Sequence, residues 1–145
     1  MDCIFCKIVN GNIKPEIIAE STNFISFLDV HPIIKGHCLI VSKRHIKTIM
    51  ELNDDEAKEI GLMQRDVSKK LKDTLDCDIT IANSNGEWAS QSIDHFHIHI
   101  IPRKKGDRLW EGENSKIVLD RSSGFERLKP SKEELQNLAN KIRGE

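Results

Sequence analysis

Long hydrophobic runs are absent from this 145-residue chain: no apolar stretch approaches the ~20 residues that a helix needs to cross a bilayer. The first residues, MDCIFCK, also lack the positive-then-apolar order of a secretory signal. We therefore expect a cytoplasmic protein that does not bind a membrane. Since thiols stay reduced in the cytosol, its four cysteines are predicted to be free.

An excess of charge of one sign is also missing. The chain has 22 Lys and Arg against 23 Asp and Glu, so its net charge is -1 and no broad field favours nucleic acid as a partner. A hydrophobic content of 38% and a charged content of 31% are typical of a soluble globular protein. Repeats and low-complexity linkers are absent too, so residues 1–145 are predicted to form a single domain.

Helix and strand signals are intermixed along the chain. Asn53 with Glu56 forms a capping box, and apolar residues at helical spacing follow it to about Leu75, whereas Ser131 with Glu134 begins a second helix near the C-terminus. Strands are predicted around 13–19, 21–29, 36–42, 78–82 and the histidine-rich stretch, and a loop over 104–124. The fold class is therefore α+β, with an antiparallel sheet of about five strands, one long helix and one C-terminal helix.

The stretch SIDHFHIHIIPRKKGD places three histidines at alternate positions. In a strand, His95, His97 and His99 would share one face at a spacing of about 6.6 Å, with apolar residues on the other. Each half-buried imidazole needs its own hydrogen-bond partner, so a merely structural strand face is the poorer explanation. Zinc ligands and a row of phosphate-handling residues remain as alternatives.

Cys3 and Cys6 have the C-x-x-C spacing of a metal or redox site. A thioredoxin-like redox motif would need a βαβ context, which the sequence lacks. Cys38 and Cys77 sit beside apolar residues and are expected to be buried in the core.

The alternation His-φ-His-φ-His-φ-φ, in which φ is apolar, resembles the signature of the histidine triad (HIT) family of nucleotide hydrolases and transferases. The similarity extends along nearly the whole chain, through CIFCKI at the start, FLDVHP, GH before a strand, KRH, QS before the triad and IPR after it. Several ordered matches with sensible spacing make the resemblance specific.

The resemblance implies a single HIT-like domain that binds a purine nucleotide across the sheet. His97 would attack the α-phosphorus and form a nucleotidyl-histidine intermediate, with His99 and His37 beside the phosphate. The backbone carbonyl of His95 would orient the nucleophile, and Asp29 would accept the ribose hydroxyls. A neutral imidazole, whose pKa is about 6.5, is a nucleophile at cellular pH, which makes this chemistry reasonable.

The resemblance also implies an apolar slot for the base, formed by Ile4, Phe5, Ile8 and Phe27. Donors near the phosphate would come from the loop before the triad, at Ser84, Gln91 and Ser92. Two positions depart from the usual pattern: Ser84 stands where an amide residue is common, and Ser90 where glycine is common. These changes bear on the choice of leaving group more than on activity.

Many members of this family bind zinc through two cysteines and two histidines, and the matching residues here are Cys3, Cys6, His45 and His95. We expect a structural zinc site; a zinc-dependent metallohydrolase, with the metal held by the triad, is the alternative. The family resemblance also implies a homodimer.

Two kinds of leaving group on the α-phosphorus remain as alternatives, a polyphosphate and an amine. The stretch PRKKGD resembles the branch of the family that cleaves dinucleoside polyphosphates. The basic residues Arg103, Lys104, Lys105 and Arg108 could attract a polyphosphate, and a solvated loop is the equal alternative for each of them. An adenosine phosphoramidase of the same family is the alternative, and both reactions share one intermediate.

Overall fold

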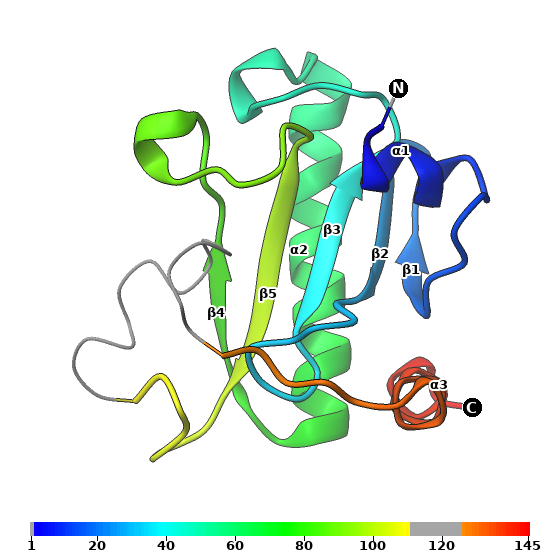
Figure 1. Ribbon diagram of the computed structural model, residues 1–145, viewed down its shortest axis with the longest axis vertical. Coiled ribbons are helices and arrows are strands. Elements are labelled where there is room, and N and C mark those ends of the chain that lie inside the picture. The colour runs from blue at the N-terminus through cyan, green and yellow to red at the C-terminus, as the bar shows by residue number, and fades with distance from the viewer. Residues whose placement is uncertain (1, 111–125) are drawn as a thin grey trace.

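Five antiparallel strands form the sheet in the computed structural model, which describes residues 2–110 and 126–145. In spatial order they are β1 (Ile17–Glu20), β2 (Phe24–Leu28), β3 (Cys38–Ser42), β5 (His97–Arg103) and β4 (Asp78–Ala82). Every neighbouring pair is antiparallel. The expected α+β class, with a sheet of this kind, a long helix and a C-terminal helix, is confirmed (Figure 1).

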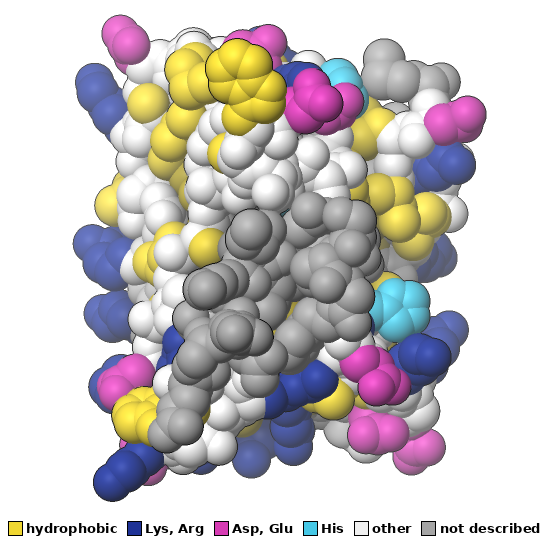
Figure 2. Space-filling model, turned by 60° about the vertical axis from the view of Figure 1, so that its left-hand side comes forward, with side chains coloured by type: hydrophobic (Ala, Val, Ile, Leu, Met, Phe, Trp, Pro, Cys, Tyr) yellow, Lys and Arg dark blue, Asp and Glu magenta, His cyan; other side chains and the backbone are white. Residues whose placement is uncertain are grey.

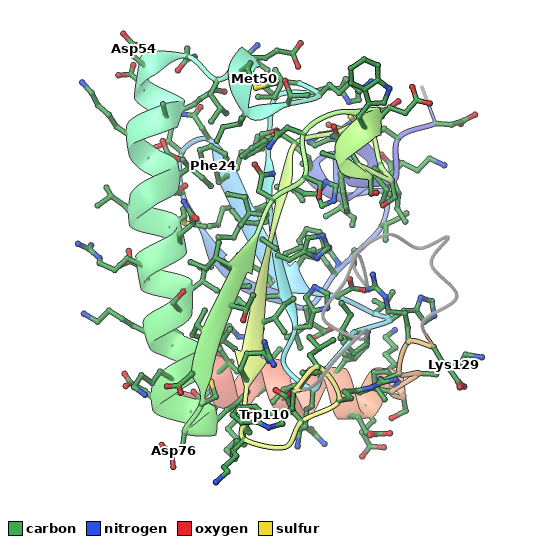
Figure 3. The ribbon with its side chains drawn as sticks, turned by 90° about the vertical axis from the view of Figure 1, so that its left-hand side faces the viewer. Phe24, Met50, Asp54, Asp76, Trp110 and Lys129 are labelled. Atoms are coloured by element: carbon green, nitrogen blue, oxygen red, sulfur yellow. The ribbon has the colours of Figure 1, made fainter. Side chains whose placement is uncertain are left out.

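The long helix α2 (Asp54–Leu75) covers one face of the sheet (Figure 1). Asn53 and Glu56 form the predicted capping box at its start. Its apolar stripe, which includes Ile60, Val67 and Leu71, is buried against the sheet and is core. Phe24 lies between this helix and the sheet (Figure 3), and α3 (Lys132–Arg143) completes the same core through Leu135, Leu138 and Ile142.

The other face carries α1 (Ile4–Val9), a helix that the sequence analysis does not predict. Its Phe5 and Ile8 are buried against strand residues of β2 and β3 in a second, smaller core. A helix of six residues shows too few turns for a periodic signal, which explains why it is missed. Two short 3-10 helices, η1 (Ile49–Glu51) and η2 (Glu87–Ala89), lie in the long connections.

Strand boundaries differ from the expected ones by a few residues. β1 begins at Ile17, not near residue 13, and β5 begins at His97, two residues after His95. The predicted loop 104–124 is described only up to Trp110, and its remainder lies outside the described residues.

No helix in the described ranges is both long enough and apolar enough to span a membrane. On the face shown in Figure 2, lysine and arginine side chains border the left edge, and acidic side chains gather near the top and the lower right. Both signs of charge therefore share this face.

Gly36 occupies a position that only glycine fits well, where the turn after β2 enters β3. Its φ is +94°, and a Cβ there would lie 2.6 Å from Leu75 Cδ1 and 3.1 Å from Pro102 Cγ. We predict that Gly36→Ala lowers the free energy of unfolding by about 1–3 kcal/mol, because it adds backbone strain and overpacking. Urea unfolding measures the difference.

Gly61→Ala is the matched control. Gly61 lies in α2 with no heavy atom within 4 Å of its added Cβ. This variant should gain about 0.5–1 kcal/mol from helix propensity. Equal unfolding midpoints for the two variants would contradict the argument.

Candidate functional site

His97 lies at the start of β5 on the face that carries α1. It pairs with Val41 across the sheet, and its ring centroid is 5.1 Å from that of Phe5. His97 Nδ1 is 2.7 Å from the backbone oxygen of His95. Because a carbonyl oxygen only accepts, Nδ1 must carry the proton, which leaves the lone pair on Nε2. His97 therefore presents a nucleophilic nitrogen, with 7% of the residue exposed.

His37 and His99 form a second hydrogen-bonded unit beside it. The backbone N–H of Ile33 donates to His37 Nδ1 at 3.1 Å, so the proton of neutral His37 is on Nε2. That nitrogen is 2.8 Å from His99 Nδ1 and donates to it. The proton of neutral His99 is then on Nε2, where it can be donated outward to an anion.

Asn83 is a further residue of this site, and no motif in the sequence points to it. Its Nδ2 donates to the backbone oxygen of His97 at 2.8 Å, and its Oδ1 accepts from Asn85 Nδ2. Asn85 Oδ1 in turn accepts from the backbone N–H of Ile49 at 2.7 Å. This chain of amides ties the loop after β4 to β5 and to η1. Only the turn-forming character of this loop was visible in the sequence.

An apolar cavity of about 360 Å³ adjoins the histidines. Its lining includes all four residues expected to contact a base, namely Ile4, Phe5, Ile8 and Phe27. Asp29 and Leu39 also line it, and Leu39 is the strand partner of His99. The structure thus brings the expected base slot and the expected ribose acceptor to one cavity.

The loop before the triad carries Gln91 and Ser92, two of the residues expected near the phosphate. Gln91 Oε1 accepts from the backbone N–H of Gly86, and its Nε2 donates to the oxygens of Lys47 and Ile93, so this side chain holds the loop together. Ser92 lines a shallow hollow that also includes Cys3 and His45.

The two positions that depart from the family pattern also lie in this loop. Ser84 is half-buried between β4 and η2. Ser90 has φ 63° and ψ 35°, a left-handed conformation that glycine adopts more easily. This backbone geometry explains why glycine is common at that position.

Of the basic residues after the triad, Arg103 ends β5, and Lys104, Lys105 and Arg108 follow it. Arg103 pairs with Asp107, its Nε lying 2.8 Å from Oδ2, and Arg108 donates to the backbone oxygen of Ile33. Arg103 lies six positions after His97 along the strand, which is roughly 20 Å. These contacts weaken the argument that this cluster attracts a polyphosphate to the histidines.

A second cluster of ligand-type side chains lies at the opposite end of the histidine row. The ligand atoms of Cys3, Cys6, His45 and His95 all lie within 4.8 Å of one another. His95 Nδ1 is 3.3 Å from Cys3 Sγ, 3.6 Å from Cys6 Sγ and 3.1 Å from His45 Nδ1. Tetrahedral zinc at its usual bond lengths separates its ligands by roughly 3.3–3.8 Å, so these residues fit the metal.

The orientation of His95 suits a metal ligand. Its Nε2 is 2.7 Å from the backbone oxygen of Ser42, so Nε2 carries the proton and Nδ1 faces the cluster with its lone pair. Burial lowers the pKa of His95, which favours the neutral form that ligates metals. The rings of the triad therefore have different surroundings: the ring of His95 belongs to this cluster, whereas His97 contacts the carbonyl of His95 and His99 contacts His37.

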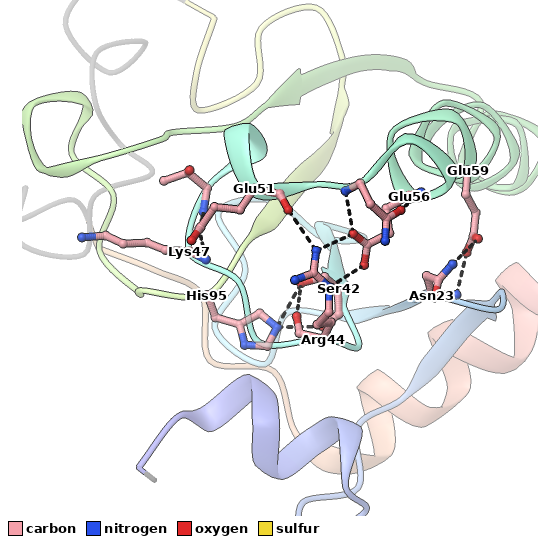
Figure 4. Close-up of polar contacts among 10 residues, drawn as sticks. Asn23, Ser42, Arg44, Lys47, Glu51, Glu56, Glu59 and His95 are labelled. Carbon is pink, nitrogen blue, oxygen red and sulfur yellow. Dashed lines mark hydrogen bonds and ion pairs between the residues drawn. The ribbon is translucent and has the colours of Figure 1, made fainter.

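An ion pair supports the loop that carries His45 (Figure 4). Arg44 Nη2 is 2.7 Å from Glu56 Oε1 and also donates to the backbone oxygen of Glu51. Glu56 is 2% exposed and accepts from the backbone N–H of Asn53, so one carboxylate joins the start of α2 to this loop. The hydrogen bond from Arg44 lowers the pKa of Glu56 below its ordinary value of 4.5.

Comparisons with known proteins give the same class as the fold and the histidine row. The family model described as HIT domain matches residues 10–106. An uncharacterised HIT-like protein of Methanocaldococcus jannaschii is 40% identical over 105 residues, which are 72% of this chain and 81% of that protein. The adenosine 5′-monophosphoramidase of Schizosaccharomyces pombe is 38% identical over 103 residues, 71% of this chain and 75% of that one.

Solved structures are similar over nearly the whole chain. A histidine triad nucleotide-binding protein of Sulfolobus tokodaii aligns with a TM-score of 0.80 at 28% identity, covering 98% of this chain and 90% of that one. A zinc-bound histidine triad family protein of Mycobacterium smegmatis aligns with a TM-score of 0.78 at 25% identity, covering 99% and 92%. The chain belongs to the HIT family.

Glu56→Gln tests the ion pair behind the cluster. A carboxylate whose pKa is lowered by folding stabilises the native state above its unfolded pKa, and this contribution is lost as pH falls through the folded pKa. We predict that the variant is less stable than wild type by roughly 1–2 kcal/mol at pH 7, and that the difference shrinks below about pH 4.5. Urea unfolding at pH 7, 5 and 3.5 measures it.

Glu87→Gln, at an exposed glutamate of η2, is the control and should change stability little at any of these pH values. A difference between wild type and Glu56→Gln that stays constant from pH 7 to pH 3.5 would contradict the assignment.

Proposed function

We propose that this protein hydrolyses purine nucleotides at the α-phosphorus by way of a nucleotidyl group on His97. The observation that carries the proposal is the hydrogen bond from His97 Nδ1 to the carbonyl of His95, which leaves Nε2 as the nucleophile. Beside it lie the His37–His99 pair and an apolar cavity edged by Asp29. One site thus combines a nucleophile, a hydrogen-bond donor for the phosphate and a cavity for a nucleoside.

The reaction proceeds in two displacements. His97 Nε2 attacks the α-phosphorus, a P–N bond forms, and the bond to the leaving group breaks. The positive charge that develops on the His97 ring is stabilised by the carbonyl of His95, and His99 Nε2–H donates to a phosphoryl oxygen. Water then cleaves the P–N bond. Overall one water is consumed: its hydroxyl ends on the phosphorus and its other proton on the leaving group.

The lining of the base slot favours binding of purines, with weak discrimination between one purine and another. Phe5, Ile8 and Phe27 are apolar and at least nine-tenths buried, so they offer stacking and burial without reading the edge of the base. Asp29, at the edge of the same cavity, is placed to accept from the ribose hydroxyls.

Two observations bear on the leaving group. Relatives at 38% and 37% identity, from Schizosaccharomyces pombe and Candida albicans, are named adenosine 5′-monophosphoramidases, which favours an amine. The stretch from Pro102 to Asp107 favours a dinucleoside polyphosphate by family resemblance, but Arg103 and Arg108 are engaged in contacts within the protein. We therefore propose phosphoramidates as the first substrate class and dinucleoside polyphosphates as the second.

We propose a structural role for zinc at the cluster of Cys3, Cys6, His45 and His95. The bound metal would link the N-terminal segment to the strand region, because the two cysteines flank the first turn of α1 and His95 precedes β5. A metallohydrolase would need its metal beside the reacting phosphate. Here the rings of His97 and His99 are engaged with the carbonyl of His95 and with His37, and both lie outside the cluster.

Removal of the metal ligands tests this role. Cys3→Ser combined with Cys6→Ser should lower the melting temperature by roughly 5–15 °C while leaving appreciable turnover at low temperature. A chelator should destabilise wild type and have little effect on this variant. Cys77→Ala, outside the cluster, should keep the chelator response. A folded, metal-free protein that is inactive until zinc is added would favour the catalytic-metal alternative.

Substitution of the triad tests the mechanism. His97→Ala should reduce turnover by roughly 10⁴-fold or more for both adenosine phosphoramidates and diadenosine polyphosphates, because both need the same nucleophile. His97→Asn should still bind AMP in calorimetry, since the cavity and Asp29 are unchanged. His99→Ala should be less severe, because water can partly replace a hydrogen-bond donor.

His95→Ala should act mainly through stability and metal binding, provided that its carbonyl stays in place. Substantial turnover by His97→Ala would show that another group attacks the phosphorus. The leaving group is assigned by comparing kcat/KM of the wild-type protein for an adenosine phosphoramidate and for a diadenosine polyphosphate.

A further inference from the structure

The C-terminal segment 126–130 crosses the turn between β2 and β3 (Figure 1, orange). The backbone N–H of Leu128 donates to the oxygen of Pro32 at 2.9 Å. Arg108 joins the two sides, with Nη1 donating to the oxygen of Ile33 and Nη2 to that of Glu126. Lys129 marks the position of this segment in Figure 3. The segment is therefore fixed against the residues that directly follow Asp29.

This arrangement places Arg127 beside Asp29. Arg127 Nη1 donates to the oxygen of His31 at 3.2 Å and is 3.5 Å from Asp29 Oδ2. The two side chains are only 11% and 2% exposed. An ion pair so shielded from water is stronger than a surface pair, and removing one partner leaves a buried charge uncompensated.

Both carboxylate oxygens of Asp29 have polar neighbours within the protein. Oδ1 accepts from the backbone N–H of His31 at 2.9 Å, while Oδ2 lies near Arg127 and 3.9 Å from His37 Nε2. The same residue lines the apolar cavity. Its carboxylate thus lies between that cavity and the His37–His99 pair, where the ribose would connect a bound base to its phosphate.

We propose that Arg127 is a positioning residue for the ribose: its ion pair holds the Asp29 carboxylate in the orientation that accepts from the 2′- and 3′-hydroxyls. This inference rests on the proposed function, because it assumes that a nucleoside occupies the cavity. Hydrogen bonds to a carboxylate are roughly twice as strong as neutral ones, so holding this carboxylate in the accepting orientation increases the preference for ribonucleotides over 2′-deoxyribonucleotides.

The test measures the dissociation constants of AMP and 2′-deoxy-AMP by calorimetry on the full chain. Arg127→Gln should weaken AMP binding about tenfold, which is ~1.4 kcal/mol, and 2′-deoxy-AMP binding about twofold, so the ratio of the two constants moves toward one. Arg127→Lys, which keeps the charge, should recover most of the ratio.

Arg108→Gln is the matched control, because it removes two hydrogen bonds of the same segment without removing the guanidinium beside Asp29. It should leave the ratio of the two dissociation constants near that of wild type. An equal change of the ratio in Arg108→Gln and Arg127→Gln would overturn the proposal, since loosening of the segment would then explain both.

A further variant separates action through Asp29 from direct contact with the nucleotide. In an Asp29→Asn background, Arg127→Gln should have little further effect on AMP binding; a full tenfold loss there would overturn the proposal. So would unchanged or tighter binding of AMP by Arg127→Gln alone. If the wild-type protein binds neither nucleotide, the proposed function is overturned together with this inference. If wild type binds AMP but Arg127→Gln leaves the ratio of the two dissociation constants unchanged, this inference alone is overturned.

Discussion

One residue, His95, connects the two chemical centres of this protein. Its backbone oxygen accepts from His97 Nδ1 and so determines which nitrogen of His97 carries the lone pair. Its ring turns to Ser42 and to the cluster that also includes Cys3, Cys6 and His45. Any shift of this residue would change the orientation of the proposed nucleophile and of the proposed metal ligand together, so the rest of the site depends on its position.

The two faces of the sheet differ in what their residues contact. The face against α2 and α3 holds the larger core and provides most of the buried apolar contact. The face against α1 holds the smaller core together with His97, and there Phe5 and Ile8 contribute both to packing and to the lining of the cavity. A metal bound at Cys3 and Cys6 would hold α1 in place, so it would support nucleotide binding without taking part in the reaction. The Arg44–Glu56 pair supports the other side of that cluster through the loop of His45.

The sequence was informative where a periodic or capping signal was long enough to read. The capping box at Asn53 with its apolar stripe predicted α2, and branched residues predicted β3. The alternating histidines and their family resemblance identified the face on which His97 and His99 lie. In contrast, α1 is too short for a helical period, and the contacts of Asn83 and Arg127 join segments that are distant in the chain. Such pairings arise from tertiary packing, which no local pattern records.

During turnover, His97 is expected to become covalently attached to the nucleotide. Rapid-quench mass spectrometry during turnover of an adenosine phosphoramidate or a diadenosine polyphosphate measures this directly, because the nucleotidyl group can be located on a peptide. We expect an adenylyl group on His97, formed within the first turnover and lost on longer incubation. A label on His95 or His99, or an unmodified protein while product forms rapidly, would contradict it.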